Sequence, residues 1–393
     1  MNHNFKIKRN ITLLKWFNFF EDFRLYAPIA IIYFAEISGS YAFGMSVFSV
    51  IYLSQSLLEV PTGILSDRHL QRKGSMICGA VAGFFSLIFY TFANDYSFLI
   101  IGAAFEGLAR SFYSGTDKAL LYETLQETGE DKDYDDCQGK VSSMFQAAIF
   151  CASLLGAAAV WHSYKLAFLL SVIPKFCQII TSCFFVEPES HSHKFETNVL
   201  AHTKEAIKSF HQNKKLKWFT IASIVSFSFG EASYQFQAAF IKNIIPDWAI
   251  NLIKSLCNLG AVFSFWFAGS IINKFGYFKI FVQGTALSGI INVAAVLINN
   301  IVSPFLLALP SLLFGTTLIA ENSIMQKEFS DKQRATMGSM VSLLGSAFFA
   351  VVSVIVGFFA DIYGAMPTLL VCILIPKIIV LPIYGIILRK QPK

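Results

Sequence analysis

Apolar runs of about 20 residues recur from one end of this 393-residue chain to the other. Each run is long enough to cross a hydrocarbon layer of roughly 30 Å, because a helix rises about 1.5 Å per residue. Only 14% of the residues are charged, against about 25% in soluble domains. The runs are continuously apolar and do not alternate with a period of two, which disfavours a β-barrel. We therefore expect an all-α membrane protein with many spans.

The hydropathy pattern predicts twelve transmembrane helices. Their expected ranges are 17–40, 42–65, 75–94, 96–124, 140–160, 163–187, 217–245, 250–272, 278–299, 302–326, 333–360 and 365–388. A long polar segment divides them into an N-terminal six-helix bundle (1–187) and a C-terminal six-helix bundle (217–393). The loop between them, residues 188–216, is expected to be cytoplasmic. Its basic second half forms either an amphipathic helix at the lipid surface or a solvated linker.

Lys and Arg are unequally distributed between the loops, and this asymmetry predicts the orientation. Of the 31 basic residues, 23 fall on one side, five lie within spans, and three (Lys165, Lys242 and Lys254) are assigned to the opposite side. Cytoplasmic loops carry such an excess, so both termini are expected to be cytoplasmic. The first apolar run is too long for a signal peptide. We expect a monomeric, multi-pass protein of a bacterial inner membrane.

The two halves of the chain echo each other at offsets of 195 to 206 residues. The matching positions are Pro174-Lys175 with Pro376-Lys377, Asp67 with Asn273, Asp117 with Glu321, and Glu36 with Glu231. Each match is weak alone, but together they place similar chemistry on equivalent helices of two halves. Such duplication is typical of transporters in which two bundles rock about a central site.

The loop after the second expected span reads Gly63-Ile-Leu-Ser-Asp-Arg-His-Leu-Gln-Arg-Lys-Gly74. It resembles the signature of the major facilitator superfamily, roughly G-x-L-A-D-R-x-G-R-K, although Leu70 replaces the inner glycine. Residues 114–123 are similar to the fourth span of some bacterial members. The resemblance implies a secondary transporter with two pseudo-symmetric six-helix bundles that works by alternating access. It also implies that spans one, four, seven and ten line a central cavity.

The same resemblance implies a cytoplasmic gate in which Asp67, Arg72 and Glu123 form a charge latch that breaks on opening. Gly63 would permit close helix approach, and Arg68 would bind acidic groups or anionic lipid. The alternative is that the basic residues only determine topology, because exposed charge clusters are often simply solvated.

An ionisable side chain at bilayer depth costs at least about 2.5 kcal/mol and normally faces a cavity or a partner. At about 100° per residue, Glu106, Arg110, Tyr113 and Asp117 would share a narrow sector of one helix. Glu106 and Arg110 are also one turn apart and can pair. These residues either bind cargo and protons, or Glu106–Arg110 is a structural pair that neutralises itself.

Acidic residues occur on all four spans that the resemblance places around the cavity. The candidate residues for cargo binding and proton coupling are Glu36, Glu106, Arg110, Tyr113, Asp117, Glu231, Tyr234, Gln235, Glu321 and Asn322. Glu36 is expected near the outer mouth. Lys175 and Lys377, each following a proline, either reach a carboxylate or cargo or, as we favour here, snorkel to the interface.

The chain has no G-x-x-x-x-G-K-[ST] phosphate loop, so ATP-driven transport by this chain alone is not expected. We expect no enzymatic activity, cofactor, metal site or nucleic-acid partner. The expected partners are a small-molecule substrate, protons and the lipid bilayer. The favoured function is proton-coupled transport of a small polar or amphipathic solute. A multidrug/proton antiporter, a lipid flippase and a non-transporting sensor remain open, as do the cargo and the direction of transport.

Overall fold

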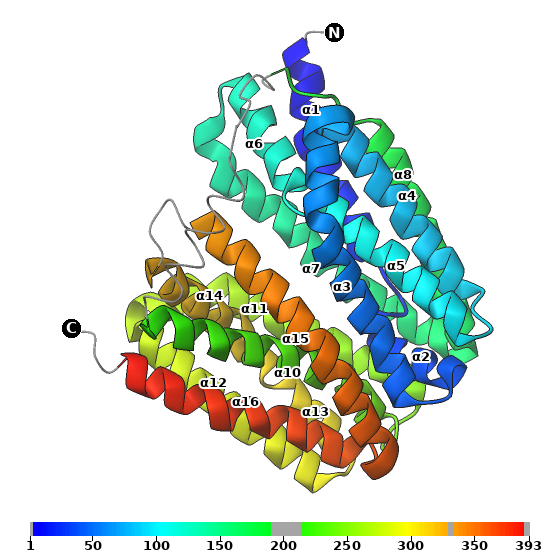
Figure 1. Cartoon of the computed structure of the whole chain (residues 1–393), viewed down its shortest axis with the longest axis vertical. Coiled ribbons are helices and arrows are strands. Elements are labelled where there is room, and N and C mark those ends of the chain that lie inside the picture. Colours follow the sequence, from blue (N-terminus) through cyan, green and yellow to red (C-terminus); the bar gives the residue numbers. More distant parts are fainter. Residues whose placement is uncertain (1–2, 190–213, 329–333, 389–393) are drawn as a thin grey trace. The chain divides into compact units, whose positions relative to one another are not determined.

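The computed structural model describes residues 3–189, 214–328 and 334–388, and every regular element in these ranges is helical (Figure 1). Contacts divide the chain into two compact units. The first contains residues 1–38 and 50–195, and the second contains residues 39–49 and 196–393. The predicted amphipathic helix within 188–216 lies almost entirely outside the described residues. The prediction of an all-helical protein is confirmed.

The first unit is built around α4, which packs against both α5 and α8, while α1 packs against α6, α7 and α8. Its elements are α1 (His3–Asp22), η1 (Ala27–Ile29), α2 (Ala30–Ser38), most of α3 (Tyr41–Leu65), the π-helical turn η2 (Ser66–Leu70), α4 (Gln71–Thr91), α5 (Tyr96–Tyr113), α6 (Thr116–Thr128), η3 (Asp131–Asp133), α7 (Tyr134–His162) and α8 (Tyr164–Cys183). Local sequence explains several helix starts. The Asp95 carboxylate accepts from the first amides of α5, and the Ser163 hydroxyl accepts from an amide of α8.

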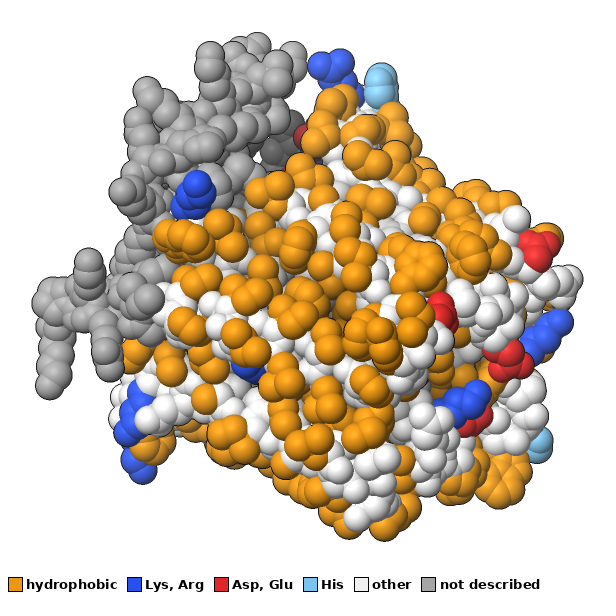
Figure 2. All heavy atoms as spheres, turned by 60° about the horizontal axis from the view of Figure 1, so that its bottom comes forward, with side chains coloured by type: hydrophobic (Ala, Val, Ile, Leu, Met, Phe, Trp, Pro, Cys, Tyr) orange, Lys and Arg blue, Asp and Glu red, His pale blue; other side chains and the backbone are white. Residues whose placement is uncertain are grey.

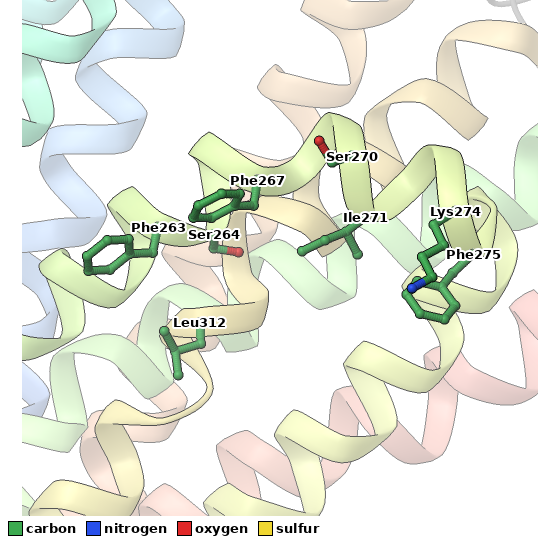
Figure 3. A pocket seen from close by; sticks show the side chains of 8 residues that line it. All are labelled: Phe263, Ser264, Phe267, Ser270, Ile271, Lys274, Phe275 and Leu312. Atoms are coloured by element: carbon green, nitrogen blue, oxygen red, sulfur yellow. The ribbon is translucent and has the colours of Figure 1, made fainter.

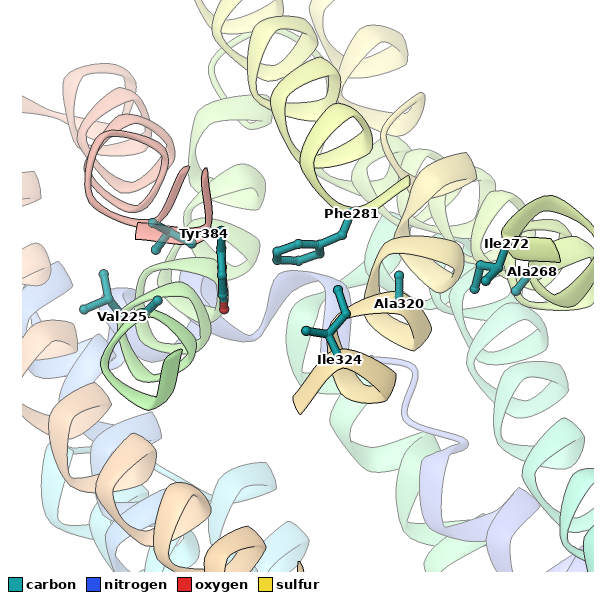
Figure 4. Close-up of a cluster of buried hydrophobic side chains, with 9 residues drawn as sticks. Val225, Ala268, Ile272, Phe281, Ala320, Ile324 and Tyr384 are labelled. Atoms are coloured by element: carbon teal, nitrogen blue, oxygen red, sulfur yellow. The ribbon is translucent and has the colours of Figure 1, made fainter. Parts of the chain in front are cut away.

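In the second unit, α10 packs against α15 and α16, and α14 packs against α11 and α12. The helices are α10 (Lys214–Ile241), α11 (Asp247–Phe275), α12 (Tyr277–Ile298), α13 (Ser303–Ala308), α14 (Ser311–Glu328), α15 (Arg334–Tyr363) and α16 (Ala365–Leu388). A buried cluster joins α10, α11, α12, α14 and α16. Figure 4 shows the rings of Phe281 and Tyr384 within it, whose centroids lie 4.6 Å apart in an edge-to-face contact.

Eight stretches of the described residues are long and apolar enough to cross a membrane. One of them, Tyr41–Thr91, continues from α3 through the π-helical turn into α4 and so contains two of the predicted spans. Hydrophobic side chains cover most of the face shown in Figure 2, and the charged side chains lie mainly toward its margins. Such a surface suits a lipid environment.

Three predicted spans are interrupted, so the prediction of continuous helices over 17–40, 96–124 and 302–326 is wrong. The first breaks between Asp22 and Ala27, just before Pro28. The second breaks at Ser114-Gly115, where Gly115 has a φ of +78°, in the left-handed region that glycine adopts without strain. The third breaks at Leu309-Pro310, between α13 and α14. Interrupted helices in a bilayer expose backbone groups that need polar partners.

Helix α3 is shared between the two units. Its first turns pack on α15, where the Asp361 carboxylate accepts from the amides of Tyr41 and Ala42 at 2.7 and 3.0 Å. Farther along the same contact, the Ser49 and Ser353 hydroxyls lie 2.5 Å apart. The remainder of α3, from residue 50, belongs to the first unit.

In the first unit, α3 and α5 approach closely at a glycine, and this contact can be tested. A Cβ built at Gly107 would lie 2.6 Å from the Ile51 carbonyl oxygen, a backbone atom that cannot move aside easily. We expect Gly107→Ala to lower the unfolding free energy by about 1–3 kcal/mol, because overpacking forces the helices apart. Thermal unfolding in detergent measures this. Gly139→Ala is the control, because no described atom lies within 4 Å of its Cβ position. Equal melting temperatures of the two variants would contradict the close approach.

Candidate functional site

Arg24 lies at the break between α1 and α2 and binds three carboxylates of the first unit. Its guanidinium donates to Glu106 Oε1 at 3.0 Å, to Glu21 Oε1 at 3.1 Å and to Asp22 Oδ1 at 3.3 Å. These side chains are 12–18% exposed. The break therefore brings one cation of the first span into contact with α5, which places Glu106.

Glu106 is the meeting point of a second cation and a tyrosine. Arg110, one turn later on α5, donates to Glu106 Oε1 at 2.7 Å, and the Tyr90 hydroxyl donates to Oε2 at 3.0 Å. The predicted Glu106–Arg110 pair is thus confirmed. The Arg110 guanidinium also lies over the ring of Tyr52, 5.6 Å from its centroid. Its Nε has no hydrogen-bond partner among the described residues, and its side chain is 28% exposed.

Lys175 on α8 extends this set of ion pairs through Glu21. Its Nζ donates to Glu21 Oε2 at 2.6 Å and to Gln178 Oε1 at 3.2 Å, and the Gln178 amide donates to the same Glu21 oxygen at 2.6 Å. The favoured prediction that Lys175 snorkels to the interface is wrong, because the ammonium pairs with a carboxylate inside the unit. The ammonium lies against α4 at Gly83, where a built Cβ would be in ordinary contact with it, 3.6 Å from Nζ.

Together these side chains form a continuous network with three cations and three carboxylates, whose formal charge is zero. We call the following set the charge network: Glu21, Asp22, Arg24, Glu106, Arg110 and Lys175. Sequence analysis placed only Glu106 and Arg110 in the cargo site and missed Glu21, Asp22 and Arg24. The available signal was the presence of three charges within four residues of an expected span.

The predicted four-residue stripe on span four does not hold. Because the helix breaks at Ser114-Gly115, Asp117 starts a new helix, α6, and leaves the line of Glu106 and Arg110. Tyr113 remains beside the network as the last residue of α5, and its ring packs on Gly79 of α4, whose built Cβ would lie 2.4 Å from it. Close packing at Gly79 thus brings α4 and α5 together. Glu36, on α2, is exposed.

The second unit holds a different polar set. On α10 the Gln235 amide donates to Glu231 Oε1 at 3.2 Å. Lys254 of α11 is 2% exposed, and its Nζ donates to the Tyr234 carbonyl at 3.1 Å and to Gln237 Oε1 at 2.9 Å. The same Nζ lies 3.8 Å from the centroid of the Tyr234 ring. The assignment of Lys254 to an outer loop is therefore wrong, because it faces α10 inside the unit.

The remaining candidates of the second unit lie on α14 and α16. The Tyr384 hydroxyl donates to Glu321 Oε1 at 3.1 Å. The side chain of Asn322 lies outside the described residues. Lys377 packs along Gly289 of α12, where a built Cβ would lie 3.3 Å from its Cε. This arrangement matches that of Lys175 with Gly83.

The residues expected at the gate lie at the start of α4. Arg72 donates to Asp67 Oδ1 at 3.0 Å and to Glu123 Oε1 at 2.9 Å. The Glu187 carboxylate accepts from the amides of Arg72 and Lys73, both at 2.8 Å, and caps α4. The structure thus brings Asp67, Arg72 and Glu123 together. For Gly63 it shows no close approach, since no described atom lies within 4 Å of its Cβ position.

Long apolar helices with ionisable side chains held among them define a polytopic membrane protein. The chain belongs to the Major Facilitator Superfamily, because the sequence profile of that family matches residues 13–347. No curated protein matched the sequence.

Several solved transporter structures share the fold. The nucleoside transporter NupG has a TM-score of 0.76 at 13% identity, covering 100% of this chain and 100% of its own. A bacterial homolog of the human lysosomal transporter Spinster gives 0.75 at 13% identity, with coverages of 100% and 99%. A POT family transporter in complex with 5-aminolevulinic acid gives 0.77 at 14% identity, with coverages of 98% and 97%. At these identities the similarity shows the fold alone.

The pairing of Glu21 with Lys175 predicts a large effect on stability. Glu21→Gln leaves the Lys175 ammonium, 8% exposed, without its carboxylate. We expect the unfolding free energy to fall by about 3–5 kcal/mol, as for other broken buried pairs. The double variant Glu21→Gln/Lys175→Gln removes both charges and should regain most of that loss. A thermal double-mutant cycle in detergent measures the coupling, and additive effects of the two substitutions would contradict it.

The ion pairs of Arg72 predict an effect on transport. Arg72→Gln removes the contacts with Asp67 and Glu123, so we expect a several-fold loss of transport at unchanged expression. Lys73→Gln is the matched control, because it removes the same charge from the neighbouring position, where only the backbone amide makes a described contact. Uptake by cells or proteoliposomes provides the measurement. An equal loss of transport in both variants would indicate that these basic residues only determine topology.

Proposed function

We propose that this protein is a proton-coupled secondary active transporter of a small polar or amphipathic solute and works by alternating access. The observation that carries the proposal is the charge network. Six ionisable groups placed at bilayer depth are expensive to insert and are normally retained for function. The network also spans a broken helix, and discontinuous helices are where transporters of several folds build their binding sites.

Arg110 is the cargo-binding residue of the proposal. It is the most exposed member of the network at 28%, against 8–18% for the others, and its Nε is without a described partner. A partly exposed guanidinium suits a carboxylate or phosphate group on the cargo. An anionic cargo group would compete with Glu106 for Arg110.

Competition between cargo and Glu106 for Arg110 would couple transport to protons. While Glu106 accepts from Arg24, Arg110 and Tyr90, its charged form is stabilised. When cargo takes Arg110, Glu106 loses one of its charged partners, and the balance moves toward the protonated acid. The empty and loaded states would then differ by one proton, which is the requirement for coupled movement of cargo and proton.

Further candidates for cargo binding and proton coupling lie outside the network. In the second unit, Glu231, Tyr234, Gln235 and Glu321 supply carboxylates, an aromatic face and amide donors. In the first unit Asp117, partly buried at the start of α6, is a separate carboxyl for proton exchange.

A groove in the first unit offers apolar surface for an amphipathic cargo. Its volume is about 470 Å³, and Phe23, Leu25, Ile173 and Pro174 are among its lining residues. Phe23 and Leu25 flank Arg24 in sequence, and Pro174 precedes Lys175. The groove lining therefore includes the chain neighbours of two network residues.

The gate and the placement in the cell belong to the same proposal. Asp67, Arg72 and Glu123 would hold the cytoplasmic side closed and separate when it opens. The Lys and Arg asymmetry supports an inner-membrane protein with both termini in the cytoplasm, and one chain forms the complete transport path.

Proteoliposomes containing a trapped pH dye test the proposal. Libraries of metabolites, rich in carboxylates and phosphates, are presented under an imposed potential. We expect cargo-dependent proton movement that Glu106→Gln reduces at least about tenfold. Asp136→Asn is the matched control, because its exposed pair with Lys140 lies outside the network and is worth little.

The outcomes separate the alternatives. Cargo flux without proton movement would replace coupling by protons with facilitated diffusion or another ion. Proton movement that survives in Glu106→Gln would transfer the coupling role to Asp117 or Glu231, whose amide variants are the next to measure. Binding without flux would indicate a sensor, and movement of labelled phospholipid alone would indicate a flippase.

A further inference from the structure

A second groove, on α11 in the second unit, is not used by the proposed transport function. Its volume is about 410 Å³, and its lining is almost entirely apolar apart from one lysine and two serines. Figure 3 shows Phe263 at one end, Phe267 farther along the helix, and Lys274 beside Phe275 at the other end. The rings are about half exposed.

The groove has the length of an acyl chain in one leaflet. From Phe263 to Phe275 the helix advances 12 residues, or about 18 Å at about 1.5 Å per residue. One leaflet contributes about half of the roughly 30 Å hydrocarbon layer. Phe263 therefore lies near the level of the chain ends when the end of α11 is at the interface. Leu312 of α14 forms the opposite wall.

Two cations mark the interfacial end. Lys274 Nζ lies 5.4 Å and Lys279 Nζ 5.7 Å from the centroid of the Phe275 ring. Both side chains are exposed. Neither makes an ion pair with any other described residue, so their charge is available to a ligand. A lysine pair at the mouth of an apolar groove is the arrangement that binds an anionic headgroup.

We propose that this groove is a binding site for one anionic phospholipid. The phosphate and headgroup lie between Lys274 and Lys279, and one acyl chain follows Phe267 and Phe263 along α11 against Leu312. The chemistry excludes the simpler ligands. A free phosphate would leave the apolar groove unused, and a zwitterionic lipid would bring a cation toward two lysines. The inference stands independently of the cargo and of proton coupling.

Native mass spectrometry of the full-length protein tests the site. The detergent-solubilised protein is mixed with equal amounts of phosphatidylglycerol and phosphatidylcholine that carry the same acyl chains. We expect preferential retention of phosphatidylglycerol, and a loss of at least about tenfold in that preference in Lys274→Gln/Lys279→Gln. Lys132→Gln/Lys140→Gln is the matched control, because it removes two exposed charges of the first unit and should retain the preference.

A third variant separates a lipid site from general attraction of anions. Leu312→Trp fills the groove and leaves both lysines in place, so we expect it to lower phosphatidylglycerol retention. Full retention in that variant would overturn the proposal, because only the headgroup would then be bound. Absence of a phosphatidylglycerol preference in the wild type, or equal loss in the matched control, would overturn it too.

A measurement on a protein with both lysines in place covers the case in which the double variant does not fold. Trp266 is 80% exposed and adjoins Phe267 in sequence. In a variant that keeps Trp266 as its only tryptophan, brominated phosphatidylglycerol should quench the fluorescence more strongly than brominated phosphatidylcholine at the same mole fraction. Equal quenching by the two lipids would overturn the proposal.

Discussion

A charge that is carried into a medium of low dielectric constant needs an opposite charge or polar partners, and the first unit is organised around ion pairs. Arg24 meets it with three carboxylates, but only because the chain leaves the helical path after Asp22. The break between α1 and α2 lets Arg24 reach α5. Glu21, near the end of α1, pairs with the buried Lys175. The same break supplies the polar partners that an interrupted helix in a bilayer needs.

Small residues decide where the charges can meet. Gly79 allows the Tyr113 ring to lie against α4, and the Lys175 side chain contacts the same helix at Gly83. Helix α4 packs against both α5 and α8, so its surface decides how closely the side chains of those two helices approach. The network is therefore as much a product of helix packing as of charge, since close approach brings residues of three helices within hydrogen-bond distance.

The two units treat their buried lysines differently. Lys377 repeats the packing of Lys175 against a glycine, at Gly289 in place of Gly83. Its chemistry has diverged, because no ion pair joins Lys377 to a carboxylate among the described residues. The most deeply buried cation of the second unit is instead Lys254, which is held by neutral oxygens and an aromatic ring. The two lysines thus share a packing contact with a glycine, while their polar partners differ.

The sequence by itself determined the helical class, the family and the local pair Glu106–Arg110. Apolar run length, the loop signature and the spacing of one helical turn are properties of neighbouring residues. Tertiary structure alone decided that Glu21 meets Lys175, 154 residues away, and that Asp117 leaves the line of Arg110. The first depends on which helices pack together, and the second on a φ of +78° at Gly115. Helical periodicity predicts neither feature, because it assumes that a helix continues unbroken and carries no information about which helices pack against it.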